Sequence, residues 1–395
     1  MIRQLLGGLC LPALALAQPS ELSSTQTRVS GVVFVDRNGN GVRDAGESGL
    51  AGVAISDQIS VTTTDSAGRF AFDARGYGVI FMTQPNGYAV RGPFWRRIEV
   101  GREVTFAVAP LGATPNFTFV HASDTHIGAE SVERTRRLKA LVDSLHPAFL
   151  LISGDLVRDA LRTPESEARG YYDLLLRELA AFTVPVYTVP GNHEIFGIER
   201  HRSLVSPTHS LYGRRFYRAM LGPDYYSFQF GGVHFVGLNS VDYDDLWYFG
   251  RVDSLQMQWL RRDVAQLPAG MPVVTFNHIP LVSAAEIIDG YEEDNVAPTI
   301  IRLRGRPPTF RHAVQNVGDV LNVLGDRLEI ALGGHMHRRE FLRYETATGT
   351  LRFAQTAAVV GPVRGEGRLG IRSGITLYRV TGGRVDDGTF VALER

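Results

Sequence analysis

Five apolar runs in the second part of the chain each end in a cluster of polar residues, and this pattern constrains the fold more than any other feature. The runs cover residues 117–122, 149–153, 184–189, 273–276 and 328–332. They are rich in β-branched and aromatic residues and alternate with helical patterns, which is typical of a layered α/β domain. We therefore expect strands whose carboxyl ends carry the functional residues.

Helical periodicity marks the segments between these runs. We predict helices over residues 132–145, 165–182, 254–267 and 313–324. In the last segment, Val314, Val317 and Leu321 recur at helical spacing, which indicates a face packed on the core.

The first part of the chain has a different character. Residues 28–111 contain short β-type runs separated by turn dipeptides such as Asn-Gly and Ala-Gly, which predicts a small all-β sandwich module. A short linker leads to the α/β domain at 116–350, and we expect a C-terminal β extension over 351–395.

The polar clusters at the strand ends are dominated by histidine and acidic residues. In chain order they supply Asp124 and His126, Asp155, Asn192 and His193, His278, and finally His335 and His337. A single Asp-x-His or Gly-Asp is as typical of a turn or cap as of a ligand, whereas Gly-Asn-His-Glu and Gly-Gly-His-x-His are more specific. Five of the 11 histidines fall in these clusters. We interpret the others as structural or supporting residues, namely His121, His146, His201, His209, His234 and His312.

The N-terminus has the pattern of a signal peptide. Arg3 supplies positive charge, residues 5–14 form a short apolar run, and Ala15-Leu16-Ala17 is a small-x-small cleavage site. We expect segment 1–17 to be removed after Ala17 and the mature chain to be periplasmic or extracellular. Cys10, the only cysteine, lies in this segment, so the mature chain has no thiolate ligand or disulfide. Metals must be held by His, Asp, Glu or Asn.

Charge and hydropathy exclude some classes of partner. The chain has 41 Lys+Arg and 41 Asp+Glu residues, a formal net charge of zero, so bulk charge does not favour nucleic acid. No segment reaches the ~18 uninterrupted apolar residues of a membrane span.

The ordered motifs Asp124-x-His126, Gly154-Asp155, Gly191-Asn192-His193-Glu194, His278 and Gly334-His335-x-His337 resemble those of the calcineurin-like metallophosphoesterases. The resemblance covers about residues 117–380 and implies a four-layer α/β/β/α sandwich. It implies that one metal takes Asp124, His126, Asp155 and His337. A second metal would take Asp155, Asn192, His278 and His335, with Asp155 bridging both and His193 unliganded above them.

Physical chemistry agrees with this implied site. Imidazole and carboxylate ligands without thiolate suit Mn, Fe, Zn or Co. Two close cations need a shared anion, and Asp155 with a bridging hydroxide would provide it, so that the hydroxide attacks phosphorus directly. His193 would stabilise the developing charge or protonate the leaving alcohol.

The substrate class stays open between phosphate monoesters and diesters. Arg364 and Arg368 lie on a glycine-rich loop that would reach a substrate phosphate, although a solvated loop is the simpler interpretation. An acidic cluster within residues 283–311 marks an insertion, either a lid or a solvated face. The alternative function is a catalytically weak surface binding protein that uses the β-module, with the phosphoesterase domain as its scaffold.

A candidate calcium loop lies in the β-module. Oxygen side chains occupy positions 1, 3, 5, 9 and 12 of the loop, with Gly41 at position 6; they are Asp36, Asn38, Asn40, Asp44 and Glu47. A strand, not a helix, precedes the loop, so it resembles the calcium-binding B-type repeats of bacterial adhesins, in a prealbumin-like module. The alternative is a plain Asx-turn loop.

Overall fold

The structure, a computed structural model, describes residues 26–285, 300–303, 308–347, 349–361 and 372–393. The predicted signal segment 1–17, most of the acidic insertion, and Arg364 and Arg368 lie outside these ranges. No helix within the described ranges is long and apolar enough to cross a membrane.

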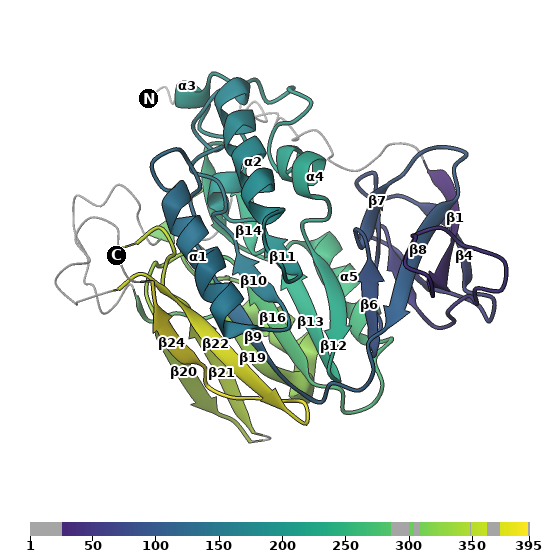
Figure 1. Cartoon of the computed structure of the whole chain (residues 1–395). Helices are drawn as coiled ribbons and strands as arrows, with labels where there is room; N and C mark the ends of the chain where they lie inside the picture. The colour runs from purple at the N-terminus through teal and green to yellow at the C-terminus, as the bar shows by residue number, and fades with distance from the viewer. Residues whose placement is uncertain (1–25, 286–299, 304–307, 348, 362–371, 394–395) are drawn as a thin grey trace, which may run out of the picture.

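Two mixed β-sheets form the centre of the larger domain (Figure 1). The first has the order β11-β10-β9-β22-β23, with β24 beside β22. Its strands are β9 (Asn116–Ala122), β10 (Leu150–Ser153), β11 (Val186–Val189), β22 (Gly374–Thr381), β23 (Arg384–Val385) and β24 (Thr389–Ala392).

The second sheet has the order β12-β13-β16-β19-β21-β20. Its strands are β12 (Tyr226–Phe230), β13 (Val233–Leu238), β16 (Val273–Asn277), β19 (Leu328–Gly333), β20 (Glu340–Glu345) and β21 (Thr350–Gln355). Two small hairpins lie outside it: β14 (Val241–Asp244) with β15 (Trp247–Gly250), and β17 (Ile300–Ile301) with β18 (Thr309–Phe310).

The four predicted helices are present, three of them shorter than expected. They are α1 (Val132–Leu145), α2 (Glu165–Leu179), α5 (Ser254–Val264) and α7 (Val317–Leu324), and the shorter α3 (Arg200–Ser203) and α4 (Arg215–Leu221) lie between α2 and β12. Helix α5 starts where the Asp253 carboxylate accepts hydrogen bonds from two backbone N–H groups of the first turn. Helices α1 and α2 cover the first sheet (Figure 1), while α5 and α7 contact each other.

Aromatic side chains join the two sheets face to face. Phe119 of the first sheet lies edge-on to Phe235 of the second, with ring centroids 5.5 Å apart, and Phe149 meets Phe228 at 5.3 Å. All four rings are buried in one hydrophobic cluster that also contains side chains of α1, α2, α5 and α7. These contacts confirm the α/β/β/α architecture expected from the sequence.

The last strands of the chain lie inside the sheets. Strand β22 pairs antiparallel with β9 over six residues, with Tyr378 opposite Phe119, and β21 pairs parallel with β19. The segment expected as a C-terminal β extension therefore contributes strands to both central sheets.

The β-module is a sandwich of two four-stranded sheets, ordered β4-β1-β8-β6 and β3-β2-β5-β7. Its strands are β1 (Thr27–Val35), β2 (Ala54–Ser56), β3 (Val61–Thr63), β4 (Arg69–Ala74), β5 (Val79–Met82), β6 (Tyr88–Arg91), β7 (Trp95–Arg97) and β8 (Val104–Pro110). These eight strands agree with the all-β sandwich expected from the sequence. A core of its own includes Val33, Ile55 and Phe106.

Buried contacts fasten the module to the larger domain. Phe81 of β5 belongs to the main hydrophobic cluster and meets the rings of Tyr226 and Trp259 at 6.5 Å and 6.2 Å. The buried Gln58 side chain donates to the Asp224 carboxylate at 2.9 Å, and the Tyr225 hydroxyl donates to the Gln58 carbonyl at 2.6 Å. The core of the larger domain thus extends into the module through Phe81, beside the module's own core.

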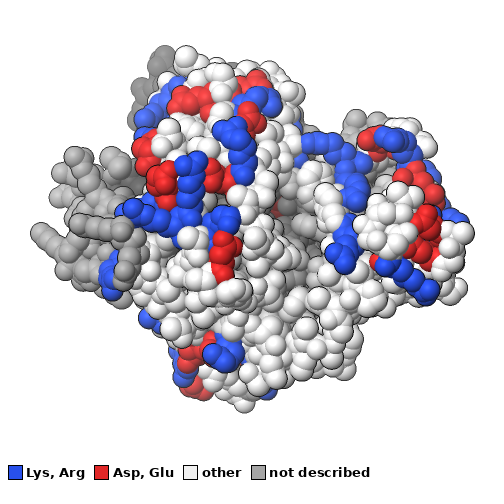
Figure 2. Space-filling model, viewed as in Figure 1, with Lys and Arg blue, Asp and Glu red and all other residues white. Residues whose placement is uncertain are grey.

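The surface of the face in Figure 2 carries mixed charge. Basic and acidic side chains are interspersed over α1 and α2, where Arg136 forms ion pairs with Glu133 and Glu178. Exposed pairs of this kind add little stability. This mixing is the local counterpart of the zero net charge.

Because Phe81 is shared between the two parts, we expect Phe81→Ala to lower the unfolding free energy of the whole chain by about 3–5 kcal/mol in one cooperative transition. Phe106→Ala, which empties the core of the module alone, is the matched control. Denaturant unfolding followed by tryptophan fluorescence checks both variants. Separate transitions, with only the module affected by Phe81→Ala, would show that the cores are independent.

Candidate metal centre

The predicted residues meet where the carboxyl ends of five strands come together. Strands β9, β10 and β11 run parallel in the first sheet, and β16 and β19 run parallel in the second. The loop after each strand carries one polar cluster. The site is therefore assembled from both sheets, at the edge where they face each other.

Three groups of ligand atoms form there. They comprise Asp124, His126 and His337; His126, Asp155 and His193; and Asp155, His278 and His335, with the atoms of each group within 4.8 Å of one another. His126 and Asp155 each belong to two groups, so the groups are contiguous. Each group is able to hold a metal ion.

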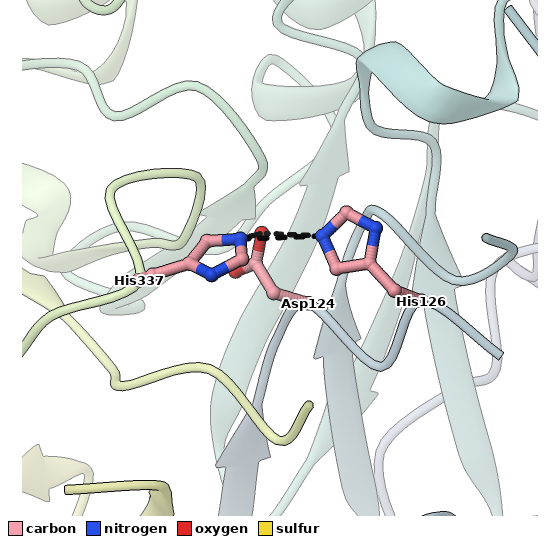
Figure 3. A group of neighbouring side chains, drawn as sticks. All are labelled: Asp124, His126 and His337. Carbon is pink, nitrogen blue, oxygen red and sulfur yellow. Dashed lines mark hydrogen bonds and ion pairs between the residues drawn. The ribbon is translucent and has the colours of Figure 1, made fainter. Parts of the chain in front are cut away.

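The first group is shown in Figure 3. His337 Nε2 lies 3.2 Å from Asp124 Oδ1, His126 Nε2 lies 3.8 Å from the same oxygen, and the two imidazole nitrogens are 3.2 Å apart. Both rings point toward the carboxylate. Ligands at about 2.1 Å from one cation lie roughly 3–3.5 Å from each other, so this spacing fits a shared ion.

Asp155 connects the first group to the rest of the site. Its Oδ1 lies 3.2 Å from His278 Nε2, while its Oδ2 lies 3.5 Å from His126 Nε2. His278 Nε2 is also 3.2 Å from Asn192 Oδ1 and 3.1 Å from His335 Nδ1. The carboxylate of Asp155 thus presents one oxygen to each half of the site, which is the placement that a bridging ligand requires.

His193 lies at the open side of this arrangement. Its Nδ1 donates a hydrogen bond to the Arg158 carbonyl at 2.6 Å, which leaves Nε2 directed toward the site, 3.9 Å from Asp155 Oδ2. Its ring is edge-on to that of His126 at 4.5 Å. The backbone N–H of His193 donates to Asp155 Oδ1. The side chain is partly exposed and is held in one orientation.

The backbone is strained at these positions. Of the nine non-glycine residues with positive φ in the described ranges, five are predicted metal ligands: Asp124, His126, Asp155, His335 and His337. Left-handed conformations are costly for such residues and persist where the surrounding structure enforces them, often at functional sites. Their concentration here supports a functional role.

Two features pack the loops tightly. A Cβ on Gly191 would lie 2.1 Å from Asp155 Oδ1, so only glycine allows this approach. The buried Glu194 carboxylate accepts hydrogen bonds from the backbone N–H groups of Leu156, Val157 and Gly191. Glu194 therefore ties the Asp155 loop to the Asn192 loop. In the sequence it stands only as the last residue of the Gly-Asn-His-Glu motif.

The electrostatics suit metal ligands. Burial disfavours ionised Asp155, but His278 and His193 outweigh it and hold its pKa well below the usual value. Burial and the neighbouring His193 lower the pKa of His126 to about 4. Burial also opposes a charged His278, yet Asp155 and Asp124 raise its pKa to about 9, so a metal there displaces a proton at neutral pH.

One residue that we interpreted as structural from the sequence lies at the site. His312 Nδ1 is 2.6 Å from His335 Nε2, and the two rings stack with centroids 4.8 Å apart. His335 Nδ1 then faces His278. No strand-end motif precedes His312 in the sequence, so no pattern marked it. His121 and His234, by contrast, are fully buried, hydrogen-bond Ser153 and Asp263, and belong to none of the three ligand groups.

The candidate calcium loop is formed, with its oxygens engaged within the loop. Buried Asp36 accepts from the backbone N–H groups of Gly39 and Gly41, and buried Glu47 from those of Arg37 and Asp44. The Asn38 and Asn40 amides both donate to Asp44 Oδ2 at 2.7 Å. Within the described residues its acids do not form a ligand group like those of the strand ends.

Two protein families match this chain. Residues 117–339, more than half of the chain, match the family described as Calcineurin-like phosphoesterase, and residues 37–104 match the family described as N terminal of Calcineurin-like phosphoesterase. The second match falls within the β-module. Both agree with the resemblance found in the sequence.

Individual relatives are distant. Human serine/threonine-protein phosphatase CPPED1 is 29% identical over 197 residues, which cover 47% of this chain and 58% of CPPED1. The 3',5'-cyclic adenosine monophosphate phosphodiesterase CpdA of Escherichia coli K12 is 21% identical over 247 residues, covering 58% of this chain and 72% of CpdA. This chain thus spans less than two thirds of the length of CPPED1.

A solved structure of GAP50, described as the anchor in the inner membrane complex of Plasmodium, covers 71% of this chain and 85% of its own at 11% identity. Its TM-score is 0.40. The family match rests on the sequence and agrees with the geometry of the site. The chain belongs to the calcineurin-like phosphoesterase family.

Proposed function

We propose that this protein is an exported phosphoesterase that hydrolyses phosphate monoesters or diesters at a pair of divalent transition metals. The observation that carries the proposal is the position of Asp155, whose two carboxylate oxygens face two separate sets of imidazoles. Family membership supplies the reaction class. The names of CPPED1 and CpdA include both a phosphatase and a phosphodiesterase, so both ester types stay within the proposal.

The ligand sets follow from the groups of the site. One metal would be held by Asp124, His126, Asp155 and His337. The other would be held by Asp155, Asn192, His278 and His335. Asn192 is included because its Oδ1 lies 3.2 Å from His278 Nε2. When bound, such a pair supplies a nucleophilic water at neutral pH and neutralises phosphoryl oxygens. Mn, Fe, Zn or Co suits these ligands.

The protein itself contributes orientation and proton transfer. Glu194 and the close packing at Gly191 hold the Asp155 carboxylate in place. His193, with Nδ1 committed to the Arg158 carbonyl, presents Nε2 to the substrate side. A protonated Nε2 donates a hydrogen bond to the phosphoryl group or a proton to the leaving alcohol.

Hydrolysis of model substrates tests the proposal. The mature protein with added Mn is assayed on a bis-aryl phosphate diester and on the matching aryl monoester. We expect turnover of at least one ester. A chelator should abolish it by removing the metals, and Asp155→Asn should abolish it because the shared ligand is lost. The preferred ester assigns the substrate class. Absence of turnover on both, with metals shown to be bound, would contradict the proposal and favour the surface binding protein with a phosphoesterase scaffold.

We expect His193→Ala to lower kcat by about 10²- to 10⁴-fold, because the variant loses an acid or electrostatic group but no metal ligand. Metal content measured by mass spectrometry should be unchanged. The matched control is His201→Ala, an exposed histidine on α3. Full activity of His193→Ala would remove this residue from the mechanism, and loss of metal would make it a ligand.

We further propose that the chain is exported and that the loop at residues 36–47 binds calcium. Support for export is the signal-peptide pattern ending at Ala17. Support for calcium is the spacing of the five oxygen side chains and the burial of Asp36 and Glu47. Sequencing of the mature N-terminus, expected at Gln18, tests export.

Calcium at millimolar concentration should raise the melting temperature of the Mn-loaded protein, because an ion that binds only the folded loop stabilises it. Glu47→Gln should abolish this rise. Asp65→Asn, which alters a different Asx turn of the module, is the control. If calcium leaves the melting temperature of the parent protein unchanged, the segment is a plain Asx-turn loop.

A further inference from the structure

Three arginines are buried within the described residues, and one of them lacks an acidic partner. Arg214 is 7% exposed and pairs with Asp242 and Asp253. Arg218 is 4% exposed and pairs with Asp224 at 2.8 Å. Arg311 is also 4% exposed, yet it forms no ion pair with any described residue.

Arg311 is packed against aromatic faces instead. Its guanidinium carbon lies 4.2 Å from the ring centroid of Tyr248 and 5.3 Å from that of Trp247. Its Nε and Nη1 are buried without a hydrogen-bond acceptor in the described part of the chain. Aromatic faces offset only part of the cost of burying a cation, so an anion is the expected partner.

The position of Arg311 points to the source of that anion. The next residue, His312, is hydrogen-bonded to the metal-site residue His335 at 2.6 Å. The Tyr248 ring that supports Arg311 is itself edge-on to the His335 ring, with centroids 6.0 Å apart. Arg311 therefore lies beside the metal centre, next to His312 in the chain and against the same Tyr248 ring that contacts His335.

We propose that Arg311 is the substrate-binding residue that receives an anionic phosphate oxygen of the ester hydrolysed at the metal centre. This inference rests on the proposed function. A guanidinium offers several N–H donors in a planar fork that matches phosphate oxygens. Tyr248 and Trp247 hold the planar group, so little side-chain freedom is lost when the phosphate binds. In this position Arg311 recognises the substrate and takes no part in proton transfer.

Exposed aromatic side chains lie beside Arg311 on the same side of the metal centre. Trp247 is 40% exposed and Phe310 is 46% exposed, on β15 and β18, two strands that contact each other. Arg311 and His312 on the same segment are buried. This side of the site therefore offers a cation for the phosphate, and exposed apolar side chains for the rest of the ester.

Arg311→Met tests the assignment, because methionine keeps an apolar, flexible side chain and removes the charge. Inorganic phosphate is the probe, titrated by calorimetry into the Mn-loaded protein. We expect the dissociation constant for phosphate and the KM for the preferred aryl ester to rise about 10- to 100-fold, with metal content unchanged. Arg311→Lys keeps the charge and loses the planar fork. Its dissociation constant for phosphate should lie between those of Arg311→Met and the parent protein.

Thermal stability without phosphate separates this role from a structural one. Removing a buried charge that has no acidic partner among the described residues should leave the melting temperature equal or higher. Arg218→Met, which leaves buried Asp224 without its cation, should lower it clearly. The exposed Arg343→Met, whose guanidinium lies over Phe341, is a second control expected to leave phosphate binding unchanged.

Unaltered phosphate affinity in Arg311→Met would overturn the proposal. A fall in its melting temperature as large as that of Arg218→Met would also overturn it, because Arg311 would then have a partner within the chain. The calorimetric titration does not require turnover. If the parent protein binds phosphate through Arg311 but hydrolyses no ester, the proposed function fails while the assignment of Arg311 as a phosphate-binding residue stands.

Discussion

The arrangement of the site depends on one carboxylate, that of Asp155. Its two oxygens lie near His126 on one side and His278 on the other, and these histidines come from loops of different sheets. A buried carboxylate surrounded by imidazoles keeps its charge, which is why its pKa is held low. The site therefore forms only when the two sheets are packed against each other.

Several costly local features serve this one placement. Asp155 itself has a left-handed backbone, as do Asp124 and His126. The close approach of Gly191 and the three backbone N–H groups on Glu194 hold the neighbouring loops against it. The aromatic layer between the sheets supplies the stability that offsets this strain, because its rings are fully buried and closely packed.

The β-module is packed against the larger domain through buried contacts. Phe81 and Gln58 extend the core and the buried hydrogen bonds of the larger domain into it. This coupling was not visible in the sequence, where the module looked like a separate unit bounded by a linker. Phe81 lies in a continuous apolar run, residues 79–82, and nothing in such a run tells which core each side chain enters.

Local residue patterns were sufficient to predict a layered α/β domain, the all-β module, four helices and the residues gathered at the strand ends. The α/β/β/α order of the layers was implied by the family resemblance. The reason is that strand periodicity, turn dipeptides and metal-ligand residue types are properties of short segments. Three features are visible only in the folded chain: the insertion of β22 beside β9, the contact of His312 with His335, and the burial of Arg311 without an acidic partner among the described residues. Each depends on side chains far apart in sequence that pack together in three dimensions, and no local pattern encodes that packing.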